Sequence, residues 1–345
     1  MVRCHLDGMQ AILIVRLGAM GDIVHALPAV AALRAAYPRA RIDWVADEKH
    51  RQLLELIPIL DRVVLLKQTL SIRHRVTELR RTLRAMSYDV AVDLQGLIKS
   101  AVVAKLSGAR RIVGFEWAHL RDRRAGWFYT DMHEPSGSSH VIHKNLALVG
   151  SLGIDVDVTT PQFPLAIPGS AVIDAWRASD PETSAAYVVL NPGAAWPNKR
   201  WPPERFGAVA SWLWRERQLR SVVTWGPQDE ALATSVVEAA PGAAVLAPPT
   251  GVADFIVLAR RARLVVSGDT GPVHLAAAVG TPVTGIYGPT DAVRNGSWAH
   301  KDRVVSRYDQ CRCHYRRRCH VAHWCLTDVS VGEVMRVIGQ RLDGA

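Results

Sequence analysis

The sequence has no long hydrophobic run. A helix that crosses a bilayer needs about 20 consecutive apolar residues, and no stretch of the 345 residues approaches that length. The apolar run at residues 11–15 is too short, and lacks the flanking residues, to be the apolar region of a signal peptide. These absences exclude a membrane-spanning helix and a secretory signal, so we expect the protein to stay in the cytoplasm.

Lysine is scarce beside arginine, and acidic residues are too few to balance the two. Lys and Arg together number 42 against 32 Asp and Glu, which gives a formal net charge of +10. Planar guanidinium groups suit phosphate and carboxylate partners, so an anionic substrate, a membrane surface and a nucleic acid are all open. The arginine residues can equally form a solvated helix face that binds no partner. No segment resembles a nucleic-acid-binding module, so we expect no nucleic-acid partner.

The dinucleotide-binding fingerprint is incomplete. The β-rich run at residues 11–15 is followed by Gly18 and Gly21, but the third glycine of G-x-G-x-x-G is missing. This absence argues against a nicotinamide-dependent nucleotide-sugar epimerase or dehydrogenase, which stays as one alternative. A non-catalytic protein that binds anions or RNA through its arginine-rich surface is the other.

Strands and helices alternate along the first half of the chain. This order predicts a parallel, doubly wound sheet. Residues 117–139 look irregular and are a candidate substrate loop, and Pro28 restricts where the helix around it can begin. The expected strands lie at residues 11–15, 41–45, 63–66, 88–94 and 111–114, and the expected helices at 23–36, 71–86, 101–106 and 140–152.

A second α/β series follows a segment rich in Pro, Thr and Asp at residues 155–170, which looks like a linker. The length suits about two domains. We therefore expect two doubly wound, Rossmann-like domains facing each other across a cleft, at residues 1–168 and 169–345. The last helix is also free to pack back on the first domain. Expected strands in the second series include residues 187–190, 221–225, 264–266 and 283–287.

The stretch from Ser267 to His274 is the most informative in the chain. It follows the buried run 264–266 and precedes good helix formers, with Pro272 at a position where a first helical turn tolerates proline. A helix that begins in this way offers unpaired N–H groups and about half a positive charge to a phosphate or diphosphate. An ordinary βαβ turn without a ligand is the alternative.

The other candidate groups also follow expected strands, where ligands of open α/β sheets collect. Asp22 lies on a glycine-flanked turn and is either a general base or a helix cap. Thr270 and Lys199 suit a diphosphate, although Lys199 is equally open as a surface lysine. Asp269 is expected to accept hydrogen bonds from loop amides or a sugar hydroxyl, and His274 is open as a buried structural histidine.

Three motifs together resemble glycosyltransferase family 9, the bacterial ADP-heptose:lipopolysaccharide heptosyltransferases. They are residues 17–28 (Gly-Asp followed by Ile-Val-His-Ala-Leu-Pro), 93–101 and 269–275, and their order and spacing match over nearly the whole chain. Residues 44–45 and 93–100 look more like heptosyltransferase I than heptosyltransferase II.

The resemblance implies the two-domain GT-B architecture, with the acceptor on the N-terminal half and the nucleotide-sugar on the C-terminal half. It implies inverting, metal-independent transfer of heptose from ADP-heptose to the Kdo and inner-core region of lipopolysaccharide. No cofactor is expected, since the ADP-sugar is a substrate. The anionic glycolipid acceptor would place the enzyme peripherally at the cytoplasmic face of the membrane. A family member with another sugar donor or acceptor is the alternative within this reading.

Residue by residue, the resemblance assigns Asp22 as the base. Glu230 is a looser match for a ribose contact, for which Gln228 is an alternative. The resemblance also implies that the arginine clusters bind the phosphate and carboxylate groups of the acceptor, with Arg73, Arg75 and Arg121 as the expected contacts. The expected donor-binding residues are Lys199, Glu230, Asp269, Thr270, Gly271 and His274.

Some segments depart from the family pattern. Ala19 stands where close relatives often have a small hydroxyl residue, and residues 191–195 replace a hydroxyl-bearing loop of heptosyltransferase I. The C-terminal spacing C-x-C-x5-C-x5-C is absent from typical heptosyltransferase I and is not a standard zinc pattern. The spacing therefore predicts no metal, and we expect reduced structural cysteines, as is usual in the cytoplasm. The four residues are Cys311, Cys313, Cys319 and Cys325.

Overall fold

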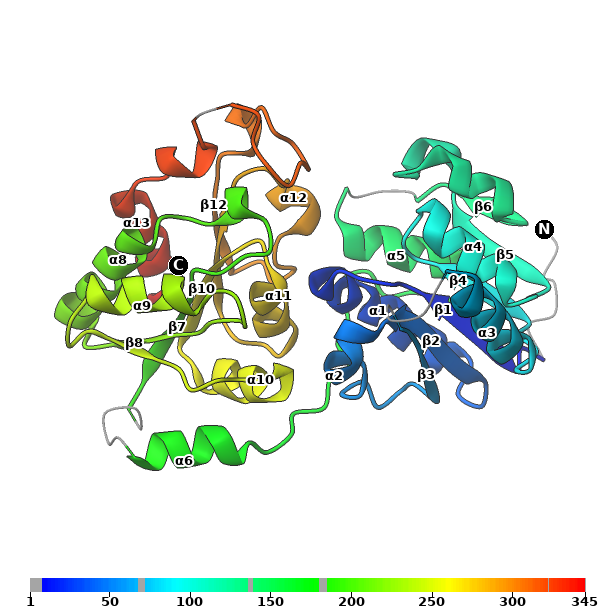
Figure 1. Ribbon diagram of the computed structural model, residues 1–345, viewed down its shortest axis with the longest axis horizontal. Helices are drawn as coiled ribbons and strands as arrows, with labels where there is room; N and C mark the ends of the chain where they lie inside the picture. Colours follow the sequence, from blue (N-terminus) through cyan, green and yellow to red (C-terminus); the bar gives the residue numbers. More distant parts are fainter. Residues whose placement is uncertain (1–7, 68–71, 136–138, 180–184, 322, 345) are drawn as a thin grey trace. The chain divides into compact units, whose positions relative to one another are not determined.

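The computed structural model describes residues 8–67, 72–135, 139–179, 185–321 and 323–344, with the side chains of residues 72, 73 and 75 left out. The chain forms two compact units, Met1–Ala166 and Ile167–Ala345 (Figure 1). Among the described residues, every helix is too short or too polar to cross a membrane.

The first unit is built on one sheet of six parallel strands, in the order β3-β2-β1-β4-β5-β6. Central strand β1 is buried at every position, as a strand covered by helices on both faces must be. Edge strand β6 lies within the segment expected to be irregular, so that expectation was wrong for these three residues. The strands are β1 (Ala11–Val15), β2 (Arg41–Asp47), β3 (Arg62–Leu66), β4 (Val90–Asp93), β5 (Arg111–Phe115) and β6 (Asp131–His133).

Helices cover both faces of this sheet, with α1 packed on α5 and α3 packed on α4. Helix α1 begins at Met20 and continues through Pro28, so proline does not delay its start as the sequence suggested. The helices are α1 (Met20–Ala36), α2 (Arg51–Leu54), α3 (Ile72–Arg84), α4 (Ile98–Leu106) and α5 (Val141–Gly150), with 3-10 turns η1 (Glu48–His50), η2 (Trp117–His119) and η3 (Arg123–Phe128).

The second unit is also built on a parallel six-stranded sheet, in the order β12-β11-β10-β7-β8-β9. Read from β9, this is the same 3-2-1-4-5-6 winding as in the first unit. The predicted fold class, two doubly wound α/β domains, is therefore confirmed. The strands are β7 (Tyr187–Asn191), β8 (Arg220–Val223), β9 (Ala244–Leu246), β10 (Leu264–Gly268), β11 (Val283–Tyr287) and β12 (Arg303–Ser306).

The last helix, α13, packs on α8, β11 and β12, all of which belong to the second unit. The remaining elements of this unit are α6 (Ala171–Ser179), η4 (Pro197–Lys199), α8 (Pro203–Arg217), α9 (Glu230–Glu238), α10 (Val252–Arg261), α11 (Gly271–Ala278), α12 (Ala292–Asn295), η5 (Tyr308–Gln310), η6 (Cys325–Asp328) and α13 (Val331–Leu342).

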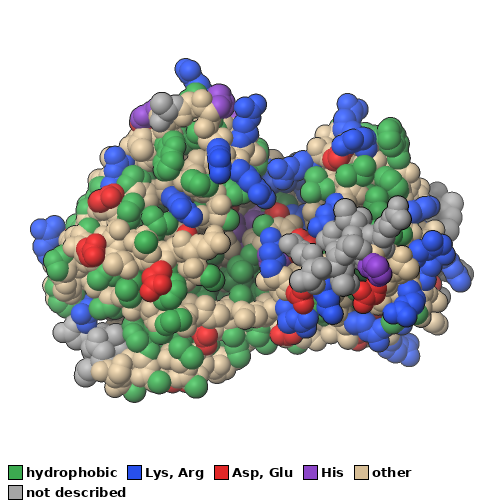
Figure 2. All heavy atoms as spheres, in the orientation of Figure 1, with side chains coloured by type: hydrophobic (Ala, Val, Ile, Leu, Met, Phe, Trp, Pro, Cys, Tyr) green, Lys and Arg blue, Asp and Glu red, His purple; other side chains and the backbone are tan. Residues whose placement is uncertain are grey.

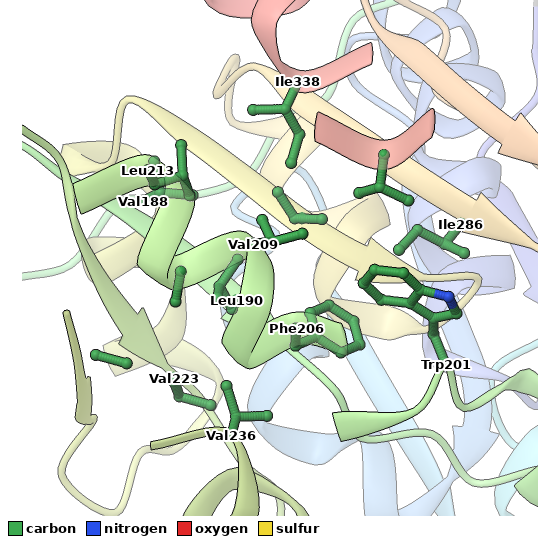
Figure 3. Close-up of a cluster of buried hydrophobic side chains, with 14 of the residues drawn as sticks. Val188, Leu190, Trp201, Phe206, Val209, Leu213, Val223, Val236, Ile286 and Ile338 are labelled. Carbon is green, nitrogen blue, oxygen red and sulfur yellow. The ribbon is translucent and has the colours of Figure 1, made fainter. Parts of the chain in front are cut away.

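The core of the second unit fixes the segment that precedes α8. Trp201 and Phe206 are buried and meet edge to face with ring centroids 5.0 Å apart (Figure 3). The Trp201 indole N–H donates to Val329 O at 3.0 Å, so this aromatic side chain leaves no buried polar atom unpaired. Two residues before it in the chain is Lys199, whose turn is thereby tied to the core.

Each sheet has one point where the winding reverses, and ligands of open α/β sheets bind there. In the first unit this point lies between β1 and β4, where Val15 pairs with Asp93. In the second unit it lies between β7 and β10, where Asn191 pairs with Ser267. The loops that follow these four strands are therefore the places to look for chemistry.

Candidate active-site residues

The turn after β1 presents Asp22, held by two contacts. Asp22 Oδ2 accepts the Ala19 N–H at 3.1 Å, as an acidic residue in a first helical turn does. Asp22 Oδ1 lies 2.8 Å from Arg16 NH2. The carboxylate is thus both a cap and an oriented group, and its side chain stays 36% exposed. Each of its oxygens has a second lone pair, which leaves room for a proton-donating hydroxyl.

Arg16 is the partner that the sequence did not predict. Its guanidinium is buried, with the side chain 7% exposed, and it also donates to Leu94 O at the end of β4. The Trp44 indole donates to Arg16 O at 3.0 Å. Arg16 therefore links the ends of three neighbouring strands and fixes the direction in which Asp22 points.

His50, from the turn after β2, lies against the same loop. Gly18 has φ +155°, and a Cβ there would be 2.6 Å from His50 Nε2, so only glycine fits. His50 is 6% exposed, and in the described part of the chain neither of its ring nitrogens has a hydrogen-bond partner. A buried imidazole of this kind is favoured in its neutral form.

We expect His50 to make the fold sensitive to acid. Burial lowers the pKa of His50 from 6.5 to about 4; Lys49 acts in the same direction, and the carboxylates of Asp47 and Asp22 oppose it. As pH falls below about 6.5 the unfolded chain takes up this proton first, so stability is lost until the folded pKa is reached. The loss amounts to roughly 3 kcal/mol.

The measurement is the free energy of unfolding in urea across this pH window, for the wild type and for His50→Leu. The variant should lose less stability than the wild type as pH falls from about 6.5 to about 4, because it lacks the group that titrates. Parallel curves for the two proteins would show that His50 is not the acid-sensitive group.

The loop after β4 is organised by the buried carboxylate of Asp93. It accepts hydrogen bonds from Tyr129 and Ser100 at 2.7 and 2.8 Å and from the backbone of Gln95 at 2.9 Å. Burial raises the pKa of Asp93, and these hydrogen bonds oppose the rise. Gln95 in turn accepts the Leu17 N–H at 2.7 Å, so this loop supports the turn that carries Asp22.

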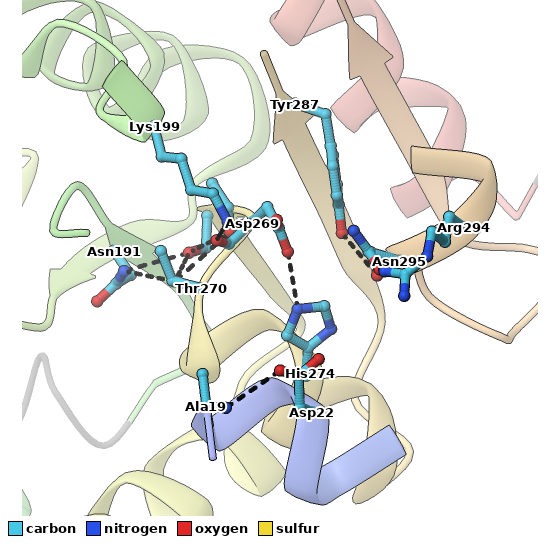
Figure 4. A network of polar contacts seen from close by, with 12 residues as sticks. Ala19, Asp22, Asn191, Lys199, Asp269, Thr270, His274, Tyr287, Arg294 and Asn295 are labelled. Atoms are coloured by element: carbon cyan, nitrogen blue, oxygen red, sulfur yellow. Dashed lines mark hydrogen bonds and ion pairs between the residues drawn. The ribbon is translucent and has the colours of Figure 1, made fainter. Parts of the chain in front are cut away.

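The second unit brings Lys199, Asp269 and His274 together (Figure 4). Lys199 Nζ lies 2.6 Å from Asp269 Oδ2 and 3.2 Å from Asp269 O, and His274 Nε2 lies 2.9 Å from Asp269 Oδ1. Burial alone would raise the pKa of Asp269, but the hydrogen bond from His274 and the charge of Lys199 hold it well below its usual range. Asp269 therefore orients these two side chains.

Among the residues that the structure describes, two of the three N–H donors of Lys199 are used and one is not. An ammonium group has three N–H donors, and Asp269 takes two of them. The ammonium also lies 4.5 Å from the centre of the Trp196 ring, and its side chain is 15% exposed. A lysine held in this way can offer its remaining N–H to an anion without first giving up its carboxylate partner.

Thr270 and Gly271 start helix α11 as the sequence predicted, with Thr270 as the N-cap and Pro272 in the first turn. The Thr270 side chain makes no cap hydrogen bond. Its hydroxyl lies 3.1 Å from Ser267 Oγ and 3.5 Å from Asn191 Nδ2. The first N–H groups of α11 thus remain available for an anion.

Close backbone approach ties this loop to the turn that carries Lys199. A Cβ at Gly268 would be 2.8 Å from Lys199 O, so the glycine permits the contact. On the other side, Arg200 NH2 pairs with Asp229 Oδ1 at 3.0 Å. These contacts join the loops after β7, β8 and β10 into one surface at the carboxyl edge of the sheet.

The remaining predicted contacts, for the ribose and for the acceptor, stay predictions. Glu230 is exposed at the first position of α9, next to Asp229, and lies outside the Lys199–Asp269–His274 group. Arg121 is exposed and precedes Asp122, whose N–H donates to Gly96 O at 3.4 Å. Arg73 and Arg75 lie in α3, but their side chains fall outside the described residues.

Sequence reasoning missed Arg16, His50, Asn191 as a side-chain donor, and the Arg200–Asp229 pair. A usable signal existed for Arg16, His50 and Asn191, because each lies at or just after the carboxyl end of a strand. Arg16 comes directly after β1, and Asn191 is the last residue of β7. Nothing local in the sequence pairs residues 29 positions apart, such as Arg200 and Asp229.

Comparison with known proteins identifies the family. A model of glycosyltransferase family 9 (heptosyltransferase) matches residues 76–325. Lipopolysaccharide heptosyltransferase 1 of Salmonella typhimurium (strain LT2) is 30% identical over 291 residues, covering 81% of this chain and 89% of that one. Its namesake from Escherichia coli O18:K1:H7 is 29% identical over 308 residues, covering 86% and 91%.

A solved structure is similar to this chain in fold as well as in sequence. E. coli heptosyltransferase WaaC with ADP-2-deoxy-2-fluoro heptose superposes with a TM-score of 0.75 at 25% identity, covering 96% of this chain and 99% of that one. The predicted GT-B architecture and the resemblance stated from the motifs are thus confirmed. The family model spans well over half of the residues, so the chain belongs to glycosyltransferase family 9, the heptosyltransferase family, and is a glycosyltransferase.

Proposed function

We propose that this enzyme transfers heptose from ADP-heptose to the Kdo and inner-core region of lipopolysaccharide, with inversion and without a catalytic metal. The observation that carries the proposal is the Lys199–Asp269–His274 group beside the open first turn of α11. The similarity to lipopolysaccharide heptosyltransferase 1 and to a heptosyltransferase solved with an ADP-heptose analogue supports it.

On the donor side, the leaving group is ADP, and negative charge develops on its diphosphate as the bond to the sugar breaks. The remaining N–H of Lys199 and the first N–H groups of α11 are preorganised donors for that charge. Thr270 adds a hydroxyl. The charge that a metal ion would otherwise neutralise is met by these groups, which is why the mechanism needs no cation.

On the acceptor side, we assign Asp22 as the general base. An inverting transfer is a single displacement: the acceptor oxygen bonds to the anomeric carbon as the bond to the ADP oxygen breaks. One carboxylate suffices to take the acceptor's proton, where a retaining hydrolase requires two. Arg16 and the Ala19 N–H hold the carboxylate in place, so its orientation is set before the acceptor binds.

The acceptor proposed here is an anionic glycolipid, and the surface of the first unit suits it. Arg80, Arg81 and Arg121 are exposed, and Lys and Arg side chains are spread more widely than Asp and Glu over the face seen in Figure 2. Trp127, in η3 beside Arg123 and Arg124, is 74% exposed. An exposed tryptophan among arginines is typical of a surface that meets lipid head groups, which favours peripheral membrane attachment.

This attachment predicts that Trp127→Ala lowers binding to vesicles of phosphatidylcholine and phosphatidylglycerol by about 10-fold, since burying a tryptophan contributes roughly 1.5 kcal/mol or more. Co-sedimentation at low and high salt measures it. The matched control is Trp214→Ala on α8, which removes a 38% exposed tryptophan from the second unit and should leave binding unchanged. Equal vesicle binding by wild type and Trp127→Ala would refute this surface assignment.

The experiment that tests the function is transfer from a panel of nucleotide-sugars to deacylated inner-core acceptors that carry Kdo, followed by mass spectrometry. ADP-heptose alone should yield a product heavier by one heptose, in buffer that contains a chelator, and NMR should show an inverted anomeric centre. Product from another sugar nucleotide only would favour the alternative donor within the family. Retained configuration would contradict the single displacement.

A further inference from the structure

The four C-terminal cysteines lie in a long connection that has almost no apolar core of its own. This connection, the cysteine loop, runs from Arg307 to Ser330 between β12 and α13, and its described residues form no regular structure beyond the short turns η5 and η6. Three of its thiols form a buried cluster, with the fourth packed against them. The members are Cys311, Cys313 and Cys325, with Cys319 alongside. A segment of this kind needs something other than hydrophobic burial to hold it.

All four thiols line one cavity of about 350 Å³. Cys319 is hydrogen-bonded to Cys313, and Cys325 is hydrogen-bonded to Cys311. Cys311 also accepts the Cys313 N–H at 3.3 Å, which joins the two pairs. The thiols are free, and they converge as one group of four rather than as two separate pairs.

Nitrogen donors surround the sulfurs. The backbone N–H groups of His320 and Val321 donate to Cys313, and Asn198 Nδ2 donates to Cys319 Sγ at 3.6 Å. N–H donors aimed at sulfur compensate negative charge, which thiolates bound to a cation carry and neutral thiols do not. These N–H donors would therefore stabilise the sulfur charge of a bound metal-thiolate group.

The histidines of the loop already have hydrogen-bond partners, although His323 and its partner Asp328 also line the cavity, so we take the sulfurs as the ligand set. His314 Nε2 lies 2.8 Å from Tyr308 O, and His323 Nε2 lies 2.7 Å from Asp328 Oδ1. His320 Nδ1 lies 3.4 Å from Cys313 Sγ and 3.4 Å from an Arg316 nitrogen, so it acts as a neighbour of one sulfur.

We propose that Cys311, Cys313, Cys319 and Cys325 form a tetrahedral thiolate site for a structural Zn²⁺ or Fe²⁺ ion. Four thiolates select soft or borderline divalent cations and disfavour Mg²⁺ and Ca²⁺. The spacing of the cysteines in the sequence argued against a metal. All four thiols line one cavity in the structure, and for this reason we now favour a metal site. Among the described residues, no three His, Cys, Asp or Glu side chains already stand at ligand spacing, so binding draws the sulfurs inward.

The site would brace the donor-binding turn. Asn198, the neighbour of Lys199, also donates to Arg316 O in the cysteine loop at 2.9 Å. Tyr315 N–H donates to Pro289 O at 2.9 Å, and a Cβ at Gly288 would be 3.0 Å from Cys325 Sγ. An ion at this position ties the loop to the end of β11 and to η4, away from the reacting groups. The role is structural and is independent of which sugar is transferred.

The test is the metal content of the full-length protein, purified without a metal-affinity column and measured by inductively coupled plasma mass spectrometry. The wild type should carry about one equivalent of zinc or iron, and an iron site is distinguished by the visible thiolate absorption that appears when the ion is oxidised to Fe³⁺ in air. Cys313→Ser should lose the metal. Cys4→Ser, which removes the one cysteine outside the loop, should retain it.

A second measurement keeps the proposal testable if Cys313→Ser does not fold. A thiol mercurial added to the wild type should release about one equivalent of metal to a chromogenic chelator, and the cysteine loop should then become the first site of proteolysis. Trace metal only, with four free thiols, would overturn the proposal. Intact mass and peptide mapping that show disulfides between Cys311 and Cys325 and between Cys313 and Cys319 would overturn it equally.

Discussion

Replacing Asp22 by asparagine is expected to lower the rate of sugar transfer by about 10²- to 10⁴-fold, the usual effect of losing a general base. Asparagine keeps the volume of the side chain, and its amide oxygen can still accept the Ala19 N–H. What it removes is the negative charge and the ability to take a proton. The protein should therefore fold, and ADP affinity measured by calorimetry should stay the same, because the donor groups lie in the other unit.

The matched control is Asp61→Asn. Asp61 is also ion-paired, with Arg34 at 2.5 Å, but it precedes β3 and so lies at the amino edge of the same sheet. Its replacement should leave transfer intact. If Asp22→Asn keeps near-normal activity while folding is normal, Asp22 is a cap and not the base. If both variants lose activity together, the effect is loss of the fold.

Replacing Lys199 by methionine is expected to weaken ADP binding by about 10- to 100-fold, since a hydrogen bond to a charged group contributes about 1.5–3 kcal/mol. The same change should lower the free energy of unfolding by about 3–5 kcal/mol, because it leaves the carboxylate of Asp269 buried without its cation. Calorimetry with ADP and urea unfolding measure the two effects separately.

A double variant separates the effect on ADP binding from the effect on stability. Lys199→Met with Asp269→Asn removes both charges, so much of the lost stability should return while ADP affinity stays low. Lys105→Met, at an exposed position of α4, controls for the loss of a lysine and should change neither quantity. Normal ADP affinity in Lys199→Met would remove Lys199 from the donor site.

The candidate site was predictable in part because its signals are local. A β-branched run, a glycine turn and a helix former follow one another at residues 264–278, and β10 and α11 are what these residues form. Burial on both faces of a parallel sheet imposes that pattern on any sequence that folds this way. The same reasoning failed at residues 131–133, because an edge strand of three residues is too short to show a pattern.

The pairings that make the site work were not predictable, because each joins positions distant in the chain. Lys199 meets Asp269 across 70 residues, and Arg16 donates to Leu94 O across 78. The sequence led us to expect that Asp269 accepts hydrogen bonds from loop amides or a sugar hydroxyl, and it did not predict the side-chain partners Lys199 and His274. Only the order of strands in the sheet decides which loops become neighbours.

The amino-acid sequence by itself determined the class of fold and the positions of the strand-to-helix turns, since hydrophobic period, glycine and proline act over a few residues. The tertiary structure alone decided that Asp22 is oriented by Arg16 and that Asp269 takes two of the three N–H donors of Lys199. It also decided that four cysteines spread over 15 positions meet at one cavity. Such contacts depend on sheet order and packing, which bring together side chains that no local pattern connects.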